Sequence, residues 1–127
     1  MLTLVRGLPG SGKSTYARKL AAQTGCLHHE TDRYFIVNGI YQFNYAELAV
    51  AHRWCLNTAR SLLEVKSDVV VSNTFVKLWE LEKYIEVANE LNCQFRVHSM
   101  PLEVNYGSSH NLPEGTLERM RSNWEIL

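Results

Sequence analysis

The chain has 127 residues, of which 46% are hydrophobic and 20% charged, which is the composition of an ordinary globular protein and the length of one domain, residues 1–127. Its 13 basic and 13 acidic residues balance, which excludes a global positive field that would collect nucleic acid, so a nucleic-acid partner would need a local basic patch. No apolar run approaches the length of a membrane span, and the N-terminus enters a predicted strand without a basic leader, so we expect no membrane partner.

Hydrophobic periodicity predicts strands and helices that alternate along the chain. Strands are expected at residues 2–5, 26–30, 68–73 and 93–100, and helices at 15–22, 45–65 and 78–91, followed by a C-terminal helix with Pro113 in its first turn. The run Val69-Val70-Val71 lacks alternation, which is typical of a parallel strand covered on both faces. This order predicts an α/β fold with a four- or five-stranded parallel sheet and helices on both faces.

Residues 7–14, Gly-Leu-Pro-Gly-Ser-Gly-Lys-Ser, fit the P-loop pattern GxxxxGK[ST]. The motif stands between a predicted strand and a predicted helix, where glycines turn backbone N–H groups toward a phosphate. Lys13 can reach the outer phosphates of a nucleoside triphosphate, and the Ser14 hydroxyl can ligate Mg²⁺. The sequence therefore predicts a three-layer P-loop NTPase fold that uses ATP and Mg²⁺, with a phosphate cradle made of Gly7, Pro9, Gly10, Ser11, Gly12, Lys13, Ser14 and Thr15.

Polar residues follow the predicted strands, and parallel sheets bind ligands outside the carboxyl ends of their strands. One crevice is therefore expected among the P-loop, Thr31-Asp32, Ser72-Asn73-Thr74 and Ser99. Phosphoryl transfer there needs a base beside the acceptor hydroxyl, and Asp32 is the candidate. The alternative role of Asp32 is that of an N-cap for the turn that follows it.

The strand at 68–73 does not end in the carboxylate that a Walker B strand would place near the metal. Its one acid, Asp68, lies at the opposite end. Mg²⁺ is therefore expected to be held by Ser14, phosphate oxygens and waters. Asn73 or Thr74 either orders that water shell or caps the helix that follows.

Five aromatic residues fall within twelve positions, and they are Tyr34, Phe35, Tyr41, Phe43 and Tyr45. Such residues can stack on bases or anchor a loop to the core, and we favour the core role. His52 is interpreted as a hydrogen-bonded structural residue. Cys26, Cys55 and Cys93 predict buried thiols in a reducing compartment, which we expect to be the cytoplasm.

Five segments together carry a resemblance to a known family: GLPGSGKSTYAR, ETDRYF, GIYQFNYAELAVAHRWC, VVVSNTFVKLWELEKYIEVA and HNLPEGTLERMRSNWE. The chain resembles the P-loop kinase domains of polynucleotide 5′-hydroxyl kinases and the kinase-like ATP-binding domains related to them. The resemblance implies that Lys13 and Ser14 bind the nucleotide phosphates and the metal. It also implies that Asp32 is the general base and that a polynucleotide 5′-hydroxyl is the acceptor.

Two departures from that family concern positive charge. Phe35 stands where phage polynucleotide kinases have an arginine that holds the acceptor phosphate, and residues 101–111 of the lid contain no lysine or arginine. A catalytic arginine, if present, is then one of Arg33, Arg119 or Arg121. Two alternatives to the polynucleotide kinase remain: a kinase for a nucleoside or sugar, and an ATP-binding regulatory module with little turnover.

Overall fold

The computed structural model of the chain describes residues 1–107 and 112–127. Its central strands are β1 (Leu2–Arg6), β2 (Leu27–His29), β5 (Val69–Asn73) and β6 (Phe95–Ser99), and a small hairpin is formed by β3 (Ile36–Val37) and β4 (Ile40–Tyr41). The α-helices are α1 (Lys13–Thr24), α2 (Leu48–Glu64), α3 (Leu78–Glu90) and α4 (Thr116–Asn123), and the 3₁₀-helices are η1 (Thr31–Phe35) and η2 (Tyr45–Glu47).

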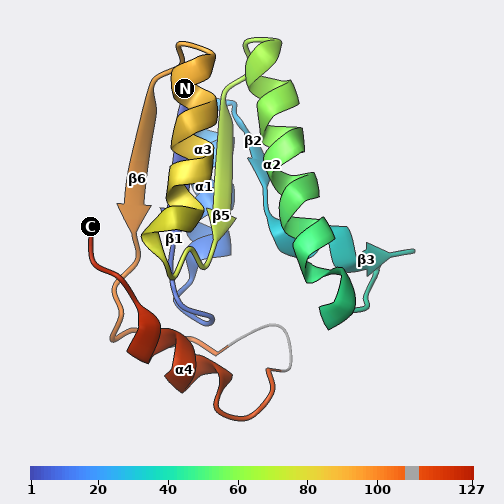
Figure 1. The fold of residues 1–127 in the computed structure, drawn as a ribbon, viewed down its shortest axis with the longest axis vertical. Helices are drawn as coiled ribbons and strands as arrows, with labels where there is room; N and C mark the ends of the chain where they lie inside the picture. The colour runs from blue at the N-terminus through green and yellow to red at the C-terminus, as the bar shows by residue number, and fades with distance from the viewer. Residues whose placement is uncertain (108–111) are drawn as a thin grey trace.

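The four central strands form one parallel sheet in the order β2-β5-β1-β6 (Figure 1). The chain leaves β1 toward β2 on one side and returns later to β6 on the other, so β1 lies at the point where the strand order reverses. In parallel sheets this point opens a crevice at the carboxyl ends of the strands. The P-loop follows β1 and therefore stands at that point.

Alternation along β1 and β5 divides the core into two layers. Leu2, Leu4, Val69 and Val71 face α2 and α3, where they pack with Cys55, Ala59, Leu63, Leu81, Tyr84, Val87 and Ala88. Val5 and Val70 face the opposite side, where they pack with Ala17 and Ala21 of α1. Helices thus cover both faces of the sheet (Figure 1), which confirms the predicted three-layer P-loop NTPase fold with four parallel strands.

The element boundaries differ from the prediction in three places. Helix α1 begins at Lys13, two residues early, because Gly12 adopts a left-handed conformation (φ 84°) that starts the helix directly after the loop. The predicted helix at 45–65 begins with the 3₁₀ turn η2, and the strand at 26–30 is three residues long. Pro113 is not in the first turn of α4, since Gly115, with φ 82°, precedes that helix directly.

The β3–β4 hairpin was not predicted. Its turn is Asn38-Gly39, and both residues have positive φ, 52° and 80°. That dipeptide is the preferred sequence for a tight hairpin turn, so the signal was present in the sequence. The hairpin is exposed, with Ile36, Val37 and Ile40 all about half or more accessible to solvent.

The last segment of the chain packs below the sheet, with α4 beneath the carboxyl ends of the strands (Figure 1). Backbone and side-chain bonds from Glu125 to Val76 and Leu78 attach it to the start of α3. None of the helices in the described ranges combines the length and hydropathy of a bilayer-spanning segment. The three cysteines are free thiols, but only Cys55 is fully buried, so the prediction of buried thiols was correct for one of the three.

Candidate phosphate-binding site

The loop after β1 has the backbone geometry of a phosphate cradle. Gly10 and Gly12 adopt φ values of 82° and 84°, which side chains rarely permit, so glycine is required at both positions. Ser11 N–H donates to the Leu8 carbonyl (3.1 Å), and Tyr16 N–H donates to the Gly12 carbonyl (2.9 Å) as α1 begins. The free N–H groups at the start of α1 therefore face the loop, as an anion site requires.

The segment after β6 lies against this loop. Tyr106 N–H donates to the Gly10 carbonyl (2.7 Å), and a Cβ added at Gly10 would collide with the Asn105 side chain. A Cβ added at Gly12 would stand 3.4 Å from the Tyr106 ring. Close packing of residues 101–107 therefore adds a second reason for glycine at position 10, whereas at Gly12 an added Cβ would only reach ordinary van der Waals contact.

The loop is built to accept polar ligands. Ser11 is 1% exposed, and its hydroxyl has no hydrogen-bond partner among the described residues. Burial lowers the pKa of Lys13, and the carboxylates of Asp32 and Glu30 oppose that shift. The charges of both carboxylates thus act on the Lys13 amine, and the hydrogen bond from Ser14 to Glu30 joins the carboxyl end of β2 to the P-loop.

Asp32 lies inside η1, and Glu30 occupies the position before that turn without capping it through its side chain. The alternative in which Asp32 acts as an N-cap is therefore wrong. The Tyr41 hydroxyl of the hairpin stands 3.5 Å from the Asp32 carboxylate, and burial together with Asp32 raises the pKa of Tyr41 to about 12. The predicted base thus faces both Lys13 and the hairpin.

Glu30 is a polar residue of the site that the sequence interpretation missed. One of its carboxylate oxygens, Oε2, accepts hydrogen bonds from the Ser14 hydroxyl (2.8 Å) and from the Ser72 hydroxyl (2.9 Å). The signal available in the sequence was the position of Glu30 at the end of a predicted strand, since the carboxyl ends of parallel strands share one edge of the sheet. Ser72 points to the same side of the sheet as Val70, toward α1, which is why it reaches this oxygen.

A hydrogen-bond chain extends from Glu30 to Arg33. Arg33 Nη2 donates to His28 Nδ1 (2.9 Å), and His28 Nε2 lies 2.7 Å from the Ser72 hydroxyl. Burial lowers the pKa of His28 to about 4, so the ring is neutral at pH 7, and the acceptor role of Nδ1 assigns its proton to Nε2. The chain of donors then runs from Arg33 through His28 and Ser72 to Glu30.

Asn73 does not cap a helix, and both polar atoms of its side chain are engaged within the protein. Its Oδ1 accepts from the Thr31 N–H (2.9 Å), and its Nδ2 lies 3.8 Å from Cys55 Sγ. The predicted cap of α3 was wrong for Asn73 and Thr74, because the residue before that helix is Lys77. His52 Nδ1 pairs with the Thr31 hydroxyl (3.2 Å), in agreement with a structural role.

The two downstream arginines lie on α4 and are exposed. Arg121 Nη2 donates to the Leu102 carbonyl (3.4 Å), and Arg119 Nη2 donates to the Thr116 hydroxyl of its own helix (3.4 Å). Arg121 therefore contacts the segment that lies on the P-loop, whereas Arg119 does not. Residues 108–111, which complete the predicted lid, lie outside the described residues.

The aromatic residues divide between the two predicted roles. Phe35 is buried, and its ring packs edge-on against Tyr34 and Phe43 at centroid distances of 5.3 and 4.9 Å. Phe43 and Tyr45 are 48% and 79% exposed. The core role thus holds for Phe35, whereas Phe43, which is stacked with Tyr41, and Tyr45 are exposed.

The donor set of this site fits Mg²⁺ carried by a nucleotide. Mg²⁺ prefers hard oxygen ligands and binds through one or two protein groups together with phosphates and waters. The Ser14 hydroxyl and the Glu30 carboxylate supply such oxygens side by side. In the described residues no group of three or more His, Cys, Asp and Glu side chains could hold a metal without such help.

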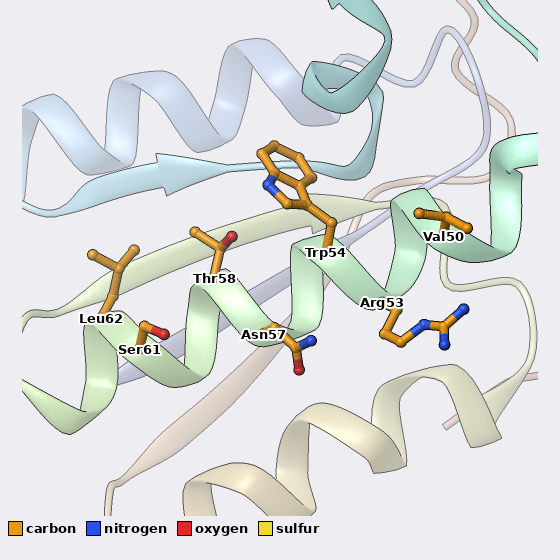
Figure 2. Close-up of a pocket in the computed structure, with 7 residues that line it drawn as sticks. All are labelled: Val50, Arg53, Trp54, Asn57, Thr58, Ser61 and Leu62. Carbon is orange, nitrogen blue, oxygen red and sulfur yellow. The ribbon is translucent and has the colours of Figure 1, made fainter.

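A separate hollow of about 480 Å³ runs along α2 (Figure 2). Its lining comes from one helix: Val50, Arg53, Trp54, Asn57, Thr58, Ser61 and Leu62. Trp54 points away from Arg53 in Figure 2, and its ring packs against His29 at a centroid distance of 4.6 Å. The hollow does not include the P-loop, so it is not part of the phosphate site.

Three features define the P-loop kinase-like class: a parallel sheet with a glycine-rich phosphate loop after an inner strand, a lysine and a serine at the start of the next helix, and carboxylates after another strand of the same sheet. The sequence profile of the AAA_33 family, described as "AAA domain", matches residues 2–103, and the chain belongs to this family.

One curated relative is NEDD4-binding protein 2 from Homo sapiens, which is 41% identical over 93 residues. The match covers 71% of the chain and 5% of that much longer protein. Only a small part of the relative is therefore comparable with this chain.

Solved structures of low sequence identity share the fold. A sugar kinase from Janibacter sp. HTCC2649 has a TM-score of 0.73 at 18% identity, with 99% of this chain and 78% of that one covered. A chain of the Pnkp1/Rnl/Hen1 RNA repair complex has a TM-score of 0.69 at 19% identity, with 96% and 43% covered. These likenesses support the P-loop kinase fold and no particular substrate.

Proposed function

We propose that this chain is a Mg²⁺-dependent ATP phosphotransferase whose acceptor is a hydroxyl group, and that this acceptor is the 5′-hydroxyl of a polynucleotide. The observation that carries the proposal is the placement of Asp32 in the turn η1 after β2, where its charge acts on the pKa of Lys13. Lys13 and the loop amides would hold the triphosphate, Ser14 would ligate Mg²⁺, and Asp32 would take the proton of the acceptor hydroxyl.

The hairpin side of Asp32 supports an acceptor with a flat ring. Tyr41 stands beside Asp32, and its ring is stacked with that of Phe43 (centroids 6.5 Å, interplanar angle 15°). Phe43 presents exposed aromatic surface there. Bases stack on such rings without regard to sequence, which suits a single-stranded end.

One observation favours a second candidate, a kinase for a nucleoside or sugar. Residues 101–107, which lie against the cradle, carry no lysine or arginine, so this segment offers no cation to an acceptor phosphate. A small hydroxyl compound would not need one. A regulatory module with little turnover is the third candidate, and it would bind ATP without forming a product.

The first experiment measures binding. Mg²⁺-ATP should raise the melting temperature of the wild type, because a ligand at about 100 times its Kd adds ~2.7 kcal/mol to stability. Lys13→Ala should remove most of that shift while its own melting temperature without nucleotide stays close to wild type. The absence of any shift with millimolar ATP or GTP would contradict the assignment of the P-loop.

The second experiment identifies the acceptor. The protein is incubated with γ-labelled ATP and a panel of 5′-hydroxyl DNA, 5′-hydroxyl RNA, nucleosides and sugars. Label transfer to the oligonucleotides, with a dependence on salt, supports the favoured acceptor. Transfer only to nucleosides or sugars selects the second candidate, and ATP binding without any product selects the regulatory module.

A further inference from the structure

The carboxylate of Glu30 is placed where the metal ligand needs a partner. Its side chain is 18% exposed, and Oε2 accepts both the Ser14 and the Ser72 hydroxyls. Ser14 is the P-loop serine, so the carboxylate touches the one protein group expected to ligate Mg²⁺ directly.

Hydroxyl chemistry gives this contact a role. A serine hydroxyl has one proton to donate and two lone pairs to offer. When the hydroxyl donates its hydrogen bond to a carboxylate, its lone pairs remain available to a cation on the other side of the oxygen. A fixed acceptor behind a ligating hydroxyl thus orients the ligand and adds negative charge near the metal.

Strand β5 cannot supply that acceptor in this chain. It lies between β1 and β2, ends in Ser72-Asn73 and contains no acidic residue. The nearest acid before it, Asp68, precedes its first residue, at the end opposite to Ser72-Asn73. The Ser72 hydroxyl donates instead to a carboxylate from the next strand out, which is that of Glu30. The carboxylate therefore reaches the side of β5 that faces α1, although it belongs to the β2 end.

The network behind Glu30 holds its position. His28 Nε2–H donates a hydrogen bond to the Ser72 hydroxyl, and Arg33 donates to the other ring nitrogen of His28. Arg33 is thereby engaged at the edge of the site. Because its guanidinium already bonds to His28, Arg33 is a weaker candidate than the arginines of α4 for contact with the triphosphate.

We propose that Glu30 is the positioning residue of the metal site: it accepts a hydrogen bond from the Ser14 hydroxyl, so that a lone pair of the Ser14 oxygen faces the Mg²⁺ carried by the nucleotide. The inference rests on the proposed nucleotide-binding function and extends it. It identifies Glu30 as the carboxylate that orients the Ser14 hydroxyl, a role that no acid of β5 can fill. Glu30 acts through Ser14 and takes no part in proton transfer from the acceptor.

The test is a titration of ATP binding against Mg²⁺, with a chelator series as the metal-free reference. Glu30→Gln should raise the Mg²⁺ concentration that half-saturates the complex by about tenfold or more, the scale for loss of a partner to a metal ligand. Its affinity for metal-free ATP should stay within about twofold of wild type, because the loop amides and Lys13 are unchanged. Binding of Mn²⁺ with ATP, followed by electron paramagnetic resonance, should weaken in the same proportion.

Two further variants separate the metal role from a structural one. Ser72→Ala removes the other donor to the same oxygen and its link to His28 but keeps the Glu30 carboxylate, so it should raise the Mg²⁺ requirement less than Glu30→Gln does. The exchange Glu30→Ser with Ser72→Asp returns one carboxylate to the same site from β5, and it should recover most of the lost Mg²⁺ affinity. This exchanged protein also tests the inference if Glu30→Gln does not fold.

The outcomes are distinct. Equal weakening of ATP binding by Glu30→Gln with and without Mg²⁺ would make Glu30 a structural link between β2, β5 and the loop, and would overturn the inference. A wild type that binds ATP without regard to Mg²⁺ would overturn it as well, and a wild type that binds no nucleotide would overturn both proposals. Binding that depends on Mg²⁺ and Glu30 but gives no product would refute only the proposed phosphotransfer.

Discussion

The turn that carries Asp32 is fixed by the hydrogen bonds of the residue before it, Thr31. The preceding residue, Thr31, is buried, its N–H donates to Asn73, and its hydroxyl pairs with His52, so the turn that carries Asp32 is attached to β5 and α2. A base for phosphoryl transfer must be fixed in this way, because a shift of about 1 Å at a reacting group can cost on the order of 100-fold in rate. The attachment comes from side chains far apart in the sequence.

Substitution of Asp32 tests this role at the scale of one atom. Asp32→Asn keeps the shape of the side chain and an acceptor oxygen, so the melting temperature and the affinity for Mg²⁺-ATP should stay near wild type. Label transfer from γ-labelled ATP should fall by about 100-fold or more, the scale for loss of a general base. Near-normal transfer by this variant would remove Asp32 from the chemistry.

At the scale of elements, α4 carries arginines next to a lid segment whose described part contains no lysine or arginine. Arg119 and Arg121 are two residues apart and therefore face different sides of the helix. Arg121 donates to the Leu102 carbonyl, within the segment that lies on the P-loop, while Arg119 bonds to its own helix. We therefore expect Arg121 to be the arginine that approaches the triphosphate.

The pair provides a matched comparison. Arg121→Ala should lower turnover by about 100-fold, the effect of losing one donor to transition-state charge, with little change in melting temperature. Arg119→Ala is the control and should keep wild-type turnover. The reverse result would assign the role to Arg119, and full activity in both variants would leave Arg33, Lys13 and Mg²⁺ as the sources of charge.

How far the elements could be predicted depended on whether their signals were local. Alternating apolar segments identified the four strands of the sheet and helices α1 to α3, since each buries a face that repeats with a regular period. The start of α4 was wrong because a proline suits a first turn, but Gly115 takes the left-handed conformation just after it. The β3–β4 hairpin was missed although Asn38-Gly39 is a strong turn signal.

At the scale of the whole molecule, Arg6 joins three parts of the chain. It is 1% exposed, and its guanidinium donates to the carbonyls of Phe75 and Val76 and lies 4.0 Å from the centroid of the Trp124 ring. Burial lowers the pKa of Arg6, and the carboxylates of Glu80 and Glu125 oppose that shift. Arg6 thus connects β1 with the segment before α3 and with the end of the chain.

Loss of the Arg6 side chain should lower the stability of the whole fold. Arg6→Ala leaves buried carbonyls without donors, so we expect it to lower the free energy of unfolding by about 3 kcal/mol, measured by chemical denaturation. Arg60→Ala, which breaks the exposed pair with Glu90 (2.8 Å), is the matched control and should cost about 0.5 kcal/mol or less. A small effect of Arg6→Ala would show that the terminal segment contributes little to stability.

The sequence by itself determined the class of the molecule and the position of its phosphate loop. Both follow from local causes: a period of apolar residues, and a motif whose glycines, lysine and serine have fixed geometric requirements. It also indicated Asp32, because an acid directly after a strand of a parallel sheet falls at the binding edge. None of these conclusions needed a contact between distant residues.

Tertiary structure alone decided how the remaining side chains are used. Glu30 meets Ser14 and Ser72 only because β2 pairs with β5 and β5 with β1, and no pattern within one segment encodes that order. The same holds for Arg6 with Trp124 and for Arg121 with Leu102, which are separated by long stretches of chain. Local sequence fixes which groups each element presents, but the pairing of strands fixes which groups meet, and that pairing depends on packing over the whole core.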